Sequence, residues 1–362
     1  MWYTSAMVKK GIKVFVGMSG GVDSSVSALL LRDEGYEVTG VFIKVWQPEF
    51  VPCMAEDDRK DAMRVAANLG IPFITLNLEN EYKRAVADYL IAEYAAGRTP
   101  NPDVMCNRHI KFGAFLRKAE KAGAAYIATG HYARITQKPD GYRLYAGVDG
   151  NKDQSYFLYT LGQSELSQTL FPVGMLTKPA VRRIAERAGL PTAHKKDSQG
   201  ICFLGKLDMK EFLSHYIPSA EGAVLDESGA KIGSHDGAHY YTLGQRHGFY
   251  AVAASPHTSP YYVVDKDMEA NTLTVSHTPS ALGVSSQDLV ITDARWTHTE
   301  PKTGKRYGAR IRYRQSLLPV AVSGIDEGRA IIHYDAAVPL VSRGQSLVLY
   351  DGDECLGGGI IV

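Results

Sequence analysis

The stretch Ser19-Gly20-Gly21-Val22-Asp23-Ser24-Ser25 constrains the fold more than any other part of the chain. It follows the apolar run Ile12–Gly17 and precedes the helical pattern Val26–Leu31. An apolar run, a glycine-serine turn and a helix make a strand-loop-helix unit. Such a loop presents backbone N–H groups and hydroxyls at a helix N-terminus, where the helix dipole favours an anion. The loop therefore predicts a phosphate-binding site, with a simple helix cap as the alternative.

The loop is neither a P-loop nor a dinucleotide-binding fingerprint, because it lacks the Lys-Ser/Thr ending and the GxGxxG spacing. It resembles the SGGxDS loop of the N-type ATP pyrophosphatases, which bind ATP and transfer AMP to an acceptor oxygen. Asp23 is the natural ligand for Mg²⁺, although a carboxylate at a helix start can also serve only the dipole. For Ile43, core packing is the alternative. The resemblance implies that ATP is bound by Gly17, Met18, Ser19, Gly20, Gly21, Val22, Asp23, Ser24, Ile43 and Gly130.

Length and composition set the limits of the interpretation. At 362 residues the chain is long enough for two or three domains, and its net charge of +1 leaves nucleic-acid binding to local patches. No apolar run of 18 residues and no signal peptide occur, which predicts a cytoplasmic protein without a membrane partner. The four cysteines are too dispersed for a disulfide framework, and no zinc or iron-sulfur site is expected. Cys53 and Cys355 are interpreted as packing residues.

Apolar runs alternate with helical patterns from residue 12 to about 130, which predicts a doubly wound parallel sheet. Ligands of such sheets bind outside the carboxyl ends of the strands. The Ser19–Ser25 loop and the stretch Thr129–Arg134 are both expected at that edge. The predicted strands are Ile12–Gly17, Glu37–Val45, Phe73–Leu78 and Ala125–Ala128. The predicted helices are Ser24–Glu34, Asp57–Leu69, Glu81–Glu93 and Ile110–Ala122.

The pattern changes twice further along the chain. Helices are predicted at Ser155–Gly162, Lys178–Ala188 and Asp208–His215, and then come glycine- and histidine-rich strands that include Tyr241–Arg246. Beyond about residue 282, strands separated by Gly/Asp turns predict a small all-β barrel, with examples at Arg310–Arg314, Ala330–Tyr334 and Ser346–Tyr350. We therefore predict an α/β catalytic domain of the ATP pyrophosphatase type at 1–207, a β-rich central domain at 208–281 and a β-barrel at 282–362.

Two cysteines stand in contexts that favour reactivity. Cys106 follows Asn101-Pro102-Asp103 and stands just before a predicted helix that begins near Arg108 in a basic stretch. A helix N-terminus and cationic neighbours lower the pKa of a thiol, and Asp103 could supply or accept a proton. Cys202 lies in a loop bounded by glycines. If the two thiols meet in space, one could carry a sulfur atom and the other release it, leaving a disulfide; a buried, inert thiol is the alternative for each.

Six motifs occur in one order along the chain and are similar to those of the bacterial tRNA-specific 2-thiouridylase family over essentially its whole length. The resemblance implies that ATP adenylates O2 of the wobble uridine in tRNA and that sulfur then replaces this oxygen at C2. The products would be 2-thiouridine, AMP and pyrophosphate. The motifs are Ser19–Ser24, Asn101–Asp103 with Cys106-Asn107, Gly130–Arg134, Lys152–Tyr156, Gly200–Phe203 and Tyr241–Arg246.

The resemblance also implies roles and partners. Cys202 would carry a persulfide, Cys106 would attack or resolve it with a Cys106–Cys202 disulfide as the result, and Asp103 would be the acid or base. Asn101, Pro102 and Asp103 would face the target base. The tRNAs would be the Lys, Glu and Gln acceptors, and a sulfur-relay or cysteine desulfurase protein would donate sulfur. Contacts to tRNA are implied for His131, Lys152, Asp153, Gln154, Arg312, Tyr313 and Gln345.

Two of these implied RNA contacts have structural alternatives. Asp153 and Gln154 could equally cap a helix at Ser155. The segment 302–314 carries six cations and no acid. If it is a strand, Arg310, Arg312 and Arg314 share one face that could meet phosphates, or that could simply be solvated.

Two other functions fit parts of the sequence. A synthetase of the same ATP-using type could adenylate a small-molecule carbonyl for amidation, but that reaction needs ammonia and gives two cysteines no role. Full activity of a double cysteine variant on a small acceptor would favour it. A non-catalytic nucleotide-binding module that scaffolds RNA or protein would release no pyrophosphate with any tRNA.

Overall fold

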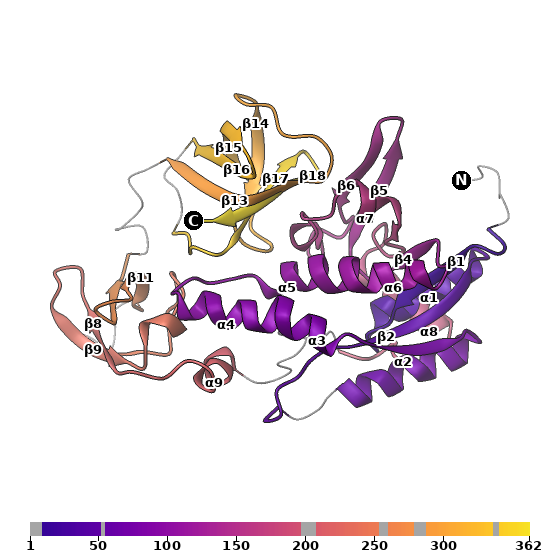
Figure 1. Cartoon of the computed structure of the whole chain (residues 1–362), viewed down its shortest axis with the longest axis horizontal. Helices are drawn as coiled ribbons and strands as arrows, with labels where there is room; N and C mark the ends of the chain where they lie inside the picture. Colours follow the sequence, from indigo (N-terminus) through magenta and orange to yellow (C-terminus); the bar gives the residue numbers. More distant parts are fainter. Residues whose placement is uncertain (1–8, 52–54, 197–207, 253–259, 279–286, 336–339) are drawn as a thin grey trace.

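The computed structural model describes residues 9–51, 55–196, 208–252, 260–278, 287–335 and 340–362. A helix-covered sheet, a small β domain near the end of helix α4 and a β-barrel make up the molecule (Figure 1). The predicted fold class, an α/β domain followed by a β-rich domain and a β-barrel, is confirmed.

The first domain is built on a five-stranded parallel sheet with the order β3-β2-β1-β4-β7. One face is covered by α1 (Val22–Asp33), α2 (Ala55–Leu69) and α8 (Lys178–Arg187), which share an apolar cluster with Val14 and Val16. The order places β1 at the centre, so the loop after β1 lies in the middle of the carboxyl edge. The strands are β1 (Lys13–Gly17), β2 (Glu37–Lys44), β3 (Phe73–Asn77), β4 (Tyr126–Ala128) and β7 (Thr169–Leu170).

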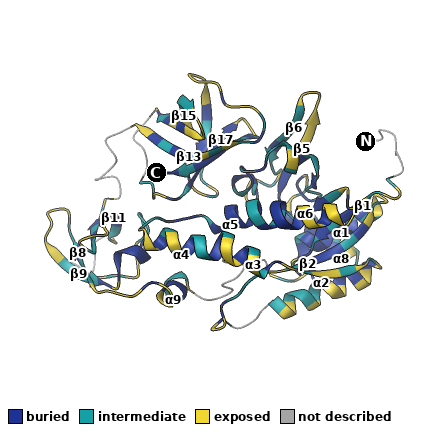
Figure 2. Ribbon diagram, in the orientation of Figure 1, coloured by how far each residue is buried: buried dark blue, intermediate teal, exposed yellow. Residues whose placement is uncertain are grey.

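Two continuous helical runs cover the opposite face of the sheet, and each contains a π-helical segment. Their buried side chains, among them Leu90 and Phe115, pack with Ile127 of β4. Helices α2 and α4 carry both buried and exposed residues, as helices that cover a core do (Figure 2). The first run is α3 (Glu79–Tyr82), η1 (Lys83–Ala87) and α4 (Asp88–Ala95); the second is α5 (Pro102–Met105), η2 (Cys106–Phe115) and α6 (Leu116–Lys121).

The central domain is a five-stranded sheet with the order β10-β9-β8-β12-β11. It begins with α9 (Met209–Ser214), where the Asp208 carboxylate accepts a hydrogen bond from the backbone N–H of Lys210 at 2.8 Å. A 3₁₀ turn, η4 (Ala238–Tyr240), follows the first hairpin. The strands are β8 (Gly222–Leu225), β9 (Lys231–His235), β10 (Tyr250–Ala251), β11 (Tyr262–Asp267) and β12 (Thr272–Ser276).

The C-terminal barrel is closed by pairing of its first and last strands, β13 and β18. A hairpin of the first domain, β5 (Ala133–Lys138) and β6 (Gly141–Ala146), extends the same sheet, because β6 pairs with β18. This hairpin was not among the predicted strands. The barrel strands are β13 (Asp288–Trp296), β14 (Arg306–Arg310), β15 (Leu318–Asp326), β16 (Arg329–Tyr334), β17 (Ser346–Asp351) and β18 (Glu354–Ile361).

Two further segments differ from their predicted structure. The predicted helix Ser155–Gly162 is only the 3₁₀ turn η3 (Ser155–Phe157), because its backbone hydrogen bonds span three residues, as from Leu158 N–H to Ser155 O. A short α7 (Gln163–Ser167) follows. The predicted strand Tyr241–Arg246 is a turn in which the Gln245 N–H donates to Thr242 O at 3.0 Å.

The predicted arginine-bearing strand is also wrong. Strand β14 ends at Arg310, because the Gln315 side chain accepts the Ile311 N–H at 3.0 Å and turns the chain. Arg314 has a left-handed backbone, with φ of 63°. Arg310, Arg312 and Arg314 therefore do not share one strand face.

Candidate functional site

The loop after β1 is held in shape by its own backbone and hydroxyl groups. The Ser24 hydroxyl accepts the Ser19 N–H at 3.2 Å, and the Ser25 hydroxyl donates to Gly21 O at 2.8 Å. No side-chain hydrogen bond caps α1 at Gly21. Gly20 has φ of 73°, and a Cβ there would lie 2.4 Å from Asp58 O. The start of α1 therefore has the geometry that suits an anion, with backbone N–H groups that no side chain caps and a glycine that allows close approach.

Asp23 carries the densest set of contacts in the loop. Its carboxylate oxygens accept from Lys178 Nζ at 2.8 and 2.7 Å, and one of them also accepts from the Tyr132 hydroxyl at 2.7 Å. Lys178 is 8% exposed and Tyr132 is 2% exposed. A buried lysine thus stands beside the loop predicted to hold phosphates, at the first turn of α8.

Three residues with an implied tRNA contact form hydrogen bonds or an ion pair within the protein, and their contact with tRNA stays a prediction. Gln154 Oε1 accepts the Tyr132 N–H at 3.0 Å, so Gln154 orients the residue that holds Asp23. Asp153 is 3% exposed and forms an ion pair with Arg310 of the barrel at 2.6 Å. Asp153 also accepts the Ser155 N–H, which is the capping role left open above. Lys152 bonds through its backbone N–H to Asp149 O.

Gly130 and Ile43 are among the residues expected to bind ATP. Gly130 packs directly on the loop, since a Cβ there would lie 2.7 Å from the Ser24 backbone nitrogen. Ile43 packs against the apolar cluster of the α3–α6 face, whereas its neighbour Phe42 belongs to the cluster on the α1–α2 face. The two roles in ATP binding stay predictions.

The helix that carries Cys106 begins earlier than predicted. Asn101 is its N-cap and accepts the Val104 N–H at 3.3 Å, and Pro102 takes the first helical position, which its fixed φ suits. Cys106 therefore lies in the second turn of the helix and is 5% exposed. The expectation of a thiol just before a helix start is wrong, and a helix N-terminus acts on charge mainly within the first turn, so this geometry does not support the predicted activation.

Asp103 lies in the first turn of the same helix and is partly buried. Loss of solvation raises the pKa of its carboxyl above the usual 3.8, against an opposing effect of Lys111. A carboxyl that keeps its proton to higher pH is suited to acid–base work.

His131 is 7% exposed and packs between Phe112, in a tilted arrangement, and Phe171, edge to face. Its Nδ1 lies 2.7 Å from the Thr129 hydroxyl. Burial and the charge of Lys111 hold its pKa well below 6.5, so the ring is neutral at pH 7. Its implied contact with tRNA stays a prediction.

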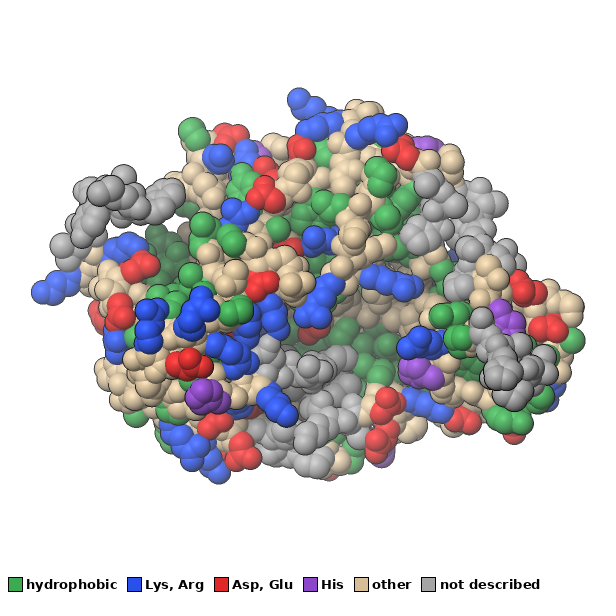
Figure 3. Space-filling view, turned by 180° about the vertical axis from the view of Figure 1, so that it is seen from behind, with side chains coloured by type: hydrophobic (Ala, Val, Ile, Leu, Met, Phe, Trp, Pro, Cys, Tyr) green, Lys and Arg blue, Asp and Glu red, His purple; other side chains and the backbone are tan. Residues whose placement is uncertain are grey.

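The other implied RNA contacts lie where the barrel meets its neighbours. Arg312 is exposed and donates to Leu340 O at 3.1 Å, and Tyr313 packs on Phe157 with 4.6 Å between ring centroids. Gln345 donates to Thr99 O at 2.8 Å. Lys and Arg side chains surround a hollow in the middle of one face, with apolar side chains within it (Figure 3).

Cys202 lies outside the described residues, so its predicted pairing with Cys106 stays a prediction. The chain that leads to it is fixed beside the loop. The Thr192 hydroxyl donates to the Ser25 hydroxyl at 3.0 Å, and Lys195 bridges Asp58 and Asp61 of α2, each at 2.7 Å. Cys53 is likewise outside the described residues, whereas Cys355 is buried in β18 and burial raises its pKa to about 12.

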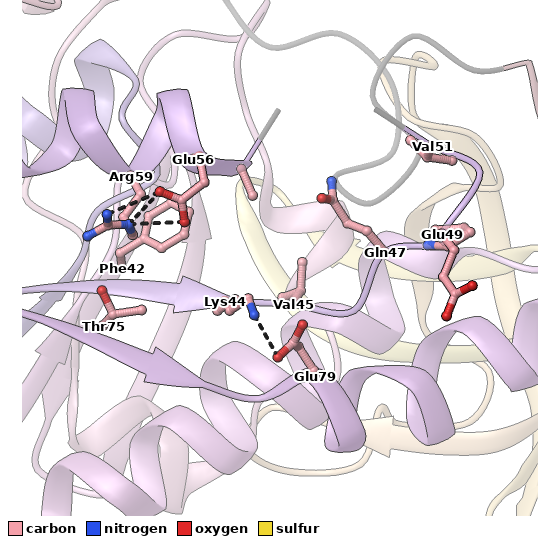
Figure 4. A pocket seen from close by; sticks show the side chains of 12 residues that line it. Phe42, Lys44, Val45, Gln47, Glu49, Val51, Glu56, Arg59, Thr75 and Glu79 are labelled. Atoms are coloured by element: carbon pink, nitrogen blue, oxygen red, sulfur yellow. Dashed lines mark hydrogen bonds and ion pairs between the residues drawn. The ribbon is translucent and has the colours of Figure 1, made fainter. Parts of the chain in front are cut away.

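A pocket of about 550 Å³ lies at the carboxyl ends of β2 and β3 (Figure 4). Two ion pairs line it, Lys44–Glu79 at 3.0 Å and Arg59–Glu56 at 3.1 Å. Glu49 adds a third carboxylate to the lining, so two cations face three acids and the pocket does not favour an anion.

Within the described ranges, no group of three or more His, Cys, Asp or Glu side chains is placed to hold a metal ion. No helix in the same ranges is long and apolar enough to cross a membrane.

Three family models match the chain in succession: a tRNA methyl transferase HUP domain at 12–206, a tRNA methyl transferase PRC-barrel domain at 210–277 and an aminomethyltransferase β-barrel domain at 286–361. The tRNA-specific 2-thiouridylase MnmA of Geobacillus thermodenitrificans is 49% identical over 96% of this chain and 94% of that protein. The MnmA of Shouchella clausii is 48% identical over 98% and 97%. This chain belongs to the tRNA-specific 2-thiouridylase family.

Solved structures show weaker likeness to this thiouridylase chain. The U34-tRNA thiolase NcsA from Methanococcus maripaludis aligns at 18% identity over 59% of this chain and 70% of that chain, with a TM-score of 0.37. A 4-thiouridine synthetase in complex with RNA and ATP aligns at 19% identity over 57% and 51%, with a TM-score of 0.35.

Lys178 and Tyr132 are residues of the candidate site that the sequence analysis does not predict. Tyr132 lies within the motif Gly130–Arg134, which gives no indication of its contact with Asp23. The signal for Lys178 was present: a lysine followed by proline at a predicted helix start puts a cation where the dipole disfavours it. Such a residue needs a nearby anion, and the structure supplies Asp23.

Proposed function

We propose that this chain is an ATP-dependent tRNA uridine 2-sulfurtransferase. It adenylates O2 of the wobble uridine, with release of pyrophosphate, and then replaces the adenylated oxygen with sulfur at C2. Membership of the 2-thiouridylase family across nearly the whole chain is the observation that carries this proposal. A carbonyl oxygen of a pyrimidine is a poor leaving group, and adenylation converts it to AMP, which leaves as a stable anion.

The first step uses the loop Ser19–Ser25 and its neighbours. Backbone N–H groups at the start of α1 bind phosphate oxygens, and Lys178 supplies the positive charge that the departing pyrophosphate requires. To do so, Lys178 exchanges part of its contact with Asp23 for a phosphate oxygen. The short distance between the loop and Lys178, set by Asp23, supports this role.

Mg²⁺ fits this site only together with that exchange. Asp23 is the one carboxylate within Ser19–Ser25, and carboxylate oxygen beside phosphate suits Mg²⁺. Both of its oxygens accept hydrogen bonds from Lys178. We propose that Asp23 holds Mg²⁺ once Lys178 has turned to the phosphates, and the ion would then neutralise phosphate charge.

The second step uses the two cysteines. The terminal sulfur of a persulfide on Cys202 attacks C2 and AMP leaves with the former O2. Cys106, as thiolate, then attacks the Cys202 sulfur, which breaks the bond to the transferred sulfur and leaves 2-thiouridine and a Cys106–Cys202 disulfide. A cellular reductant reopens the disulfide, and a sulfur-relay or cysteine desulfurase protein reloads Cys202. The fixed approach of the chain beside the ATP loop supports this placement of Cys202.

The substrate is placed by the turn Asn101–Asp103. The wobble uridine leaves the anticodon stack, as bases do when enzymes act on them, and Asp103 exchanges the proton. The Lys, Glu and Gln acceptors remain proposals, as do the contacts to tRNA by His131, Lys152, Asp153, Gln154, Arg312, Tyr313 and Gln345.

The test is nucleoside mass spectrometry of tRNA incubated with the protein, ATP and a sulfur source. We expect 2-thiouridine with the unaltered protein and none with Cys202→Ser or Cys106→Ser. Cys355→Ser is the matched control, because it changes another cysteine that is buried far along the chain in β18. Absence of 2-thiouridine with every tRNA and sulfur source would overturn the proposal.

A further inference from the structure

Thr99 stands two residues before the N-cap of the Cys106 helix, and each of its hydrogen-bonding groups bonds to another domain. Its backbone N–H donates to Arg343 O at 2.8 Å, and its carbonyl accepts from Gln345 Nε2 at 2.8 Å. Its hydroxyl lies 3.1 Å from the hydroxyl of Thr242 in the central domain. A buried residue of the first domain, 7% exposed, is thus fixed by both β domains at once.

The barrel side of this junction is itself rigid. Gly344 has φ of 92°, and a Cβ there would lie 3.0 Å from the Thr99 backbone, so that close contact suits glycine. The turn is fastened to β18, because Gly344 N–H donates to Ile361 O and Ile361 N–H donates to Gln345 O, both at 2.9 Å.

The central-domain side is equally well held. Gly244 N–H donates to Val263 O at 2.7 Å and Val263 N–H donates to Gln245 O at 2.9 Å, which fastens the Thr242 turn to β11. The Tyr94 side chain of α4 also hydrogen-bonds to Thr242, and burial raises the pKa of this tyrosine to about 12.

Arg312 connects the two turns on the outside. Its guanidinium donates to Leu340 O at 3.1 Å, just ahead of the barrel turn, and to Leu243 O at 3.5 Å, within the Thr242 turn. It is exposed, and it is one of the residues proposed to meet tRNA phosphates. A phosphate bound at Arg312 therefore acts on both turns that grip Thr99.

We infer that Thr99 is a positioning residue, which passes tRNA binding across the two β domains to the turn Asn101–Asp103 and so sets that turn for sulfur transfer. The inference rests on the proposed function and adds the route by which bound tRNA acts on the turn before Cys106. Thr99 touches neither the base nor the reacting sulfur in this account. It fixes where the helix of Cys106 begins, and small displacements of reacting groups carry large rate costs.

The test uses Thr99→Val, which keeps the side-chain shape and removes the hydroxyl. We expect kcat for thiolation to fall about tenfold at saturating tRNA, with the KM for ATP unchanged within about twofold. Thr99→Ser should restore kcat. Thr242→Val should cause at least the same fall, since it also removes the hydrogen bond to Tyr94. The double variant should be no slower than Thr242→Val alone, because both changes remove the contact between the two threonine hydroxyls.

Thr297→Val is the matched control. Thr297 is 1% exposed and its hydroxyl donates to Cys355 O at 2.9 Å inside the barrel, away from the junction. It should lower the melting temperature about as much as Thr99→Val and leave kcat unchanged. Equal kcat for the two variants, or additive effects of Thr99→Val and Thr242→Val, would overturn the inference.

Hydrogen exchange separates this inference from the proposed function. We expect tRNA to slow amide exchange in the peptide 99–106 of the unaltered protein, and to slow it much less in Thr99→Val. This measurement needs no thiolation. Equal slowing of exchange in both proteins overturns the inference, even if 2-thiouridine forms. If the slowing differs between the two proteins but no 2-thiouridine is made, the inference about Thr99 stands and the proposed function fails.

Discussion

The loop Ser19–Ser25, proposed to bind ATP and called the ATP loop below, and the turn Asn101–Asp103 before Cys106 differ in which parts of the chain fix their shape. The loop Ser19–Ser25 obtains its shape from its own hydroxyls and backbone, and its partners Tyr132 and Lys178 come from the same domain. The turn before Cys106 is fixed by residues of two other domains, through Thr99. A loop that is proposed to bind the phosphates of a small nucleotide can be assembled within one domain, whereas a turn that is proposed to face a base of tRNA gains from contacts with the domains proposed to bind that tRNA.

The largest effect is expected where the first domain meets the barrel. Asp153→Asn removes the charge that compensates Arg310, a half-buried guanidinium, and should cost about 3–5 kcal/mol in the free energy of unfolding, measured by urea denaturation. The control Asp335→Asn breaks an exposed pair with Arg306 and should cost at most about 1 kcal/mol. If both variants lower the free energy of unfolding by the same small amount, the ion pair between Asp153 and Arg310 contributes little to stability.

A comparable loss, confined to the first step, is expected at the ATP loop. Lys178→Ala should lower the rate of pyrophosphate release about 10²–10³-fold, because it removes the cation beside the phosphates. Affinity for tRNA should stay unchanged, which separates the two regions. Lys210→Ala, at an exposed pair with Asp236, is the matched control. If Lys178→Ala lowers thiolation but leaves the rate of pyrophosphate release unchanged, Lys178 acts in the second step, with the turn before Cys106, and not with the loop Ser19–Ser25.

An intermediate effect concerns access to Cys106. Because its thiol is buried, alkylation in the free native protein should be about tenfold or more slower than in urea, as followed by peptide mass spectrometry. Adding tRNA should slow alkylation of Cys106 further, because the same binding is expected to slow amide exchange in the peptide 99–106, and it should leave the labelling of Cys355 unchanged. Rapid labelling of Cys106 without tRNA would show a turn that is already open.

The smallest effect is a pH dependence from Asp103. Its pKa is raised on folding, so the folded state holds the proton more tightly, and stability falls as pH rises from the unfolded value of 3.8 through the folded pKa. Asp103→Asn removes this penalty and should stabilise the protein at pH 7 relative to acid pH, while it abolishes thiolation. Thermal melts across pH 3–7 measure this, and a parallel offset at every pH would contradict it.

What could be predicted from sequence follows the same division. The parallel sheet, the ATP loop and the buried Cys355 follow from local patterns, since period, glycine turns and motif spacing lie within short stretches. The start of the Cys106 helix was placed too late, although Asn101 and Pro102 carry an N-cap and a first-turn signal that could have been used.

Contacts between distant segments could not be predicted. Nothing near Asp153 indicates Arg310 as its partner, and nothing near Gln345 indicates Thr99, because these pairs form only when the three domains assemble. The prediction of a strand at Arg310–Arg314 is wrong for a local reason. The Gln315 side chain accepts the Ile311 N–H, and strand pairing ends there.

The pairing of the β5–β6 hairpin with β18 can form only at the end of translation, because β18 is the last strand of the chain. Strand β6 leaves the ribosome well before β18, the strand beside which it finally lies, with Leu144 opposite Cys355 and Tyr145 opposite Glu354. Until the last residues are synthesised, the edge of β6 that later pairs with β18 is uncovered, and nascent chains can associate through such an edge. A copy cut short within the barrel would keep that edge permanently, so premature termination late in translation should yield an insoluble protein rather than a shorter working enzyme.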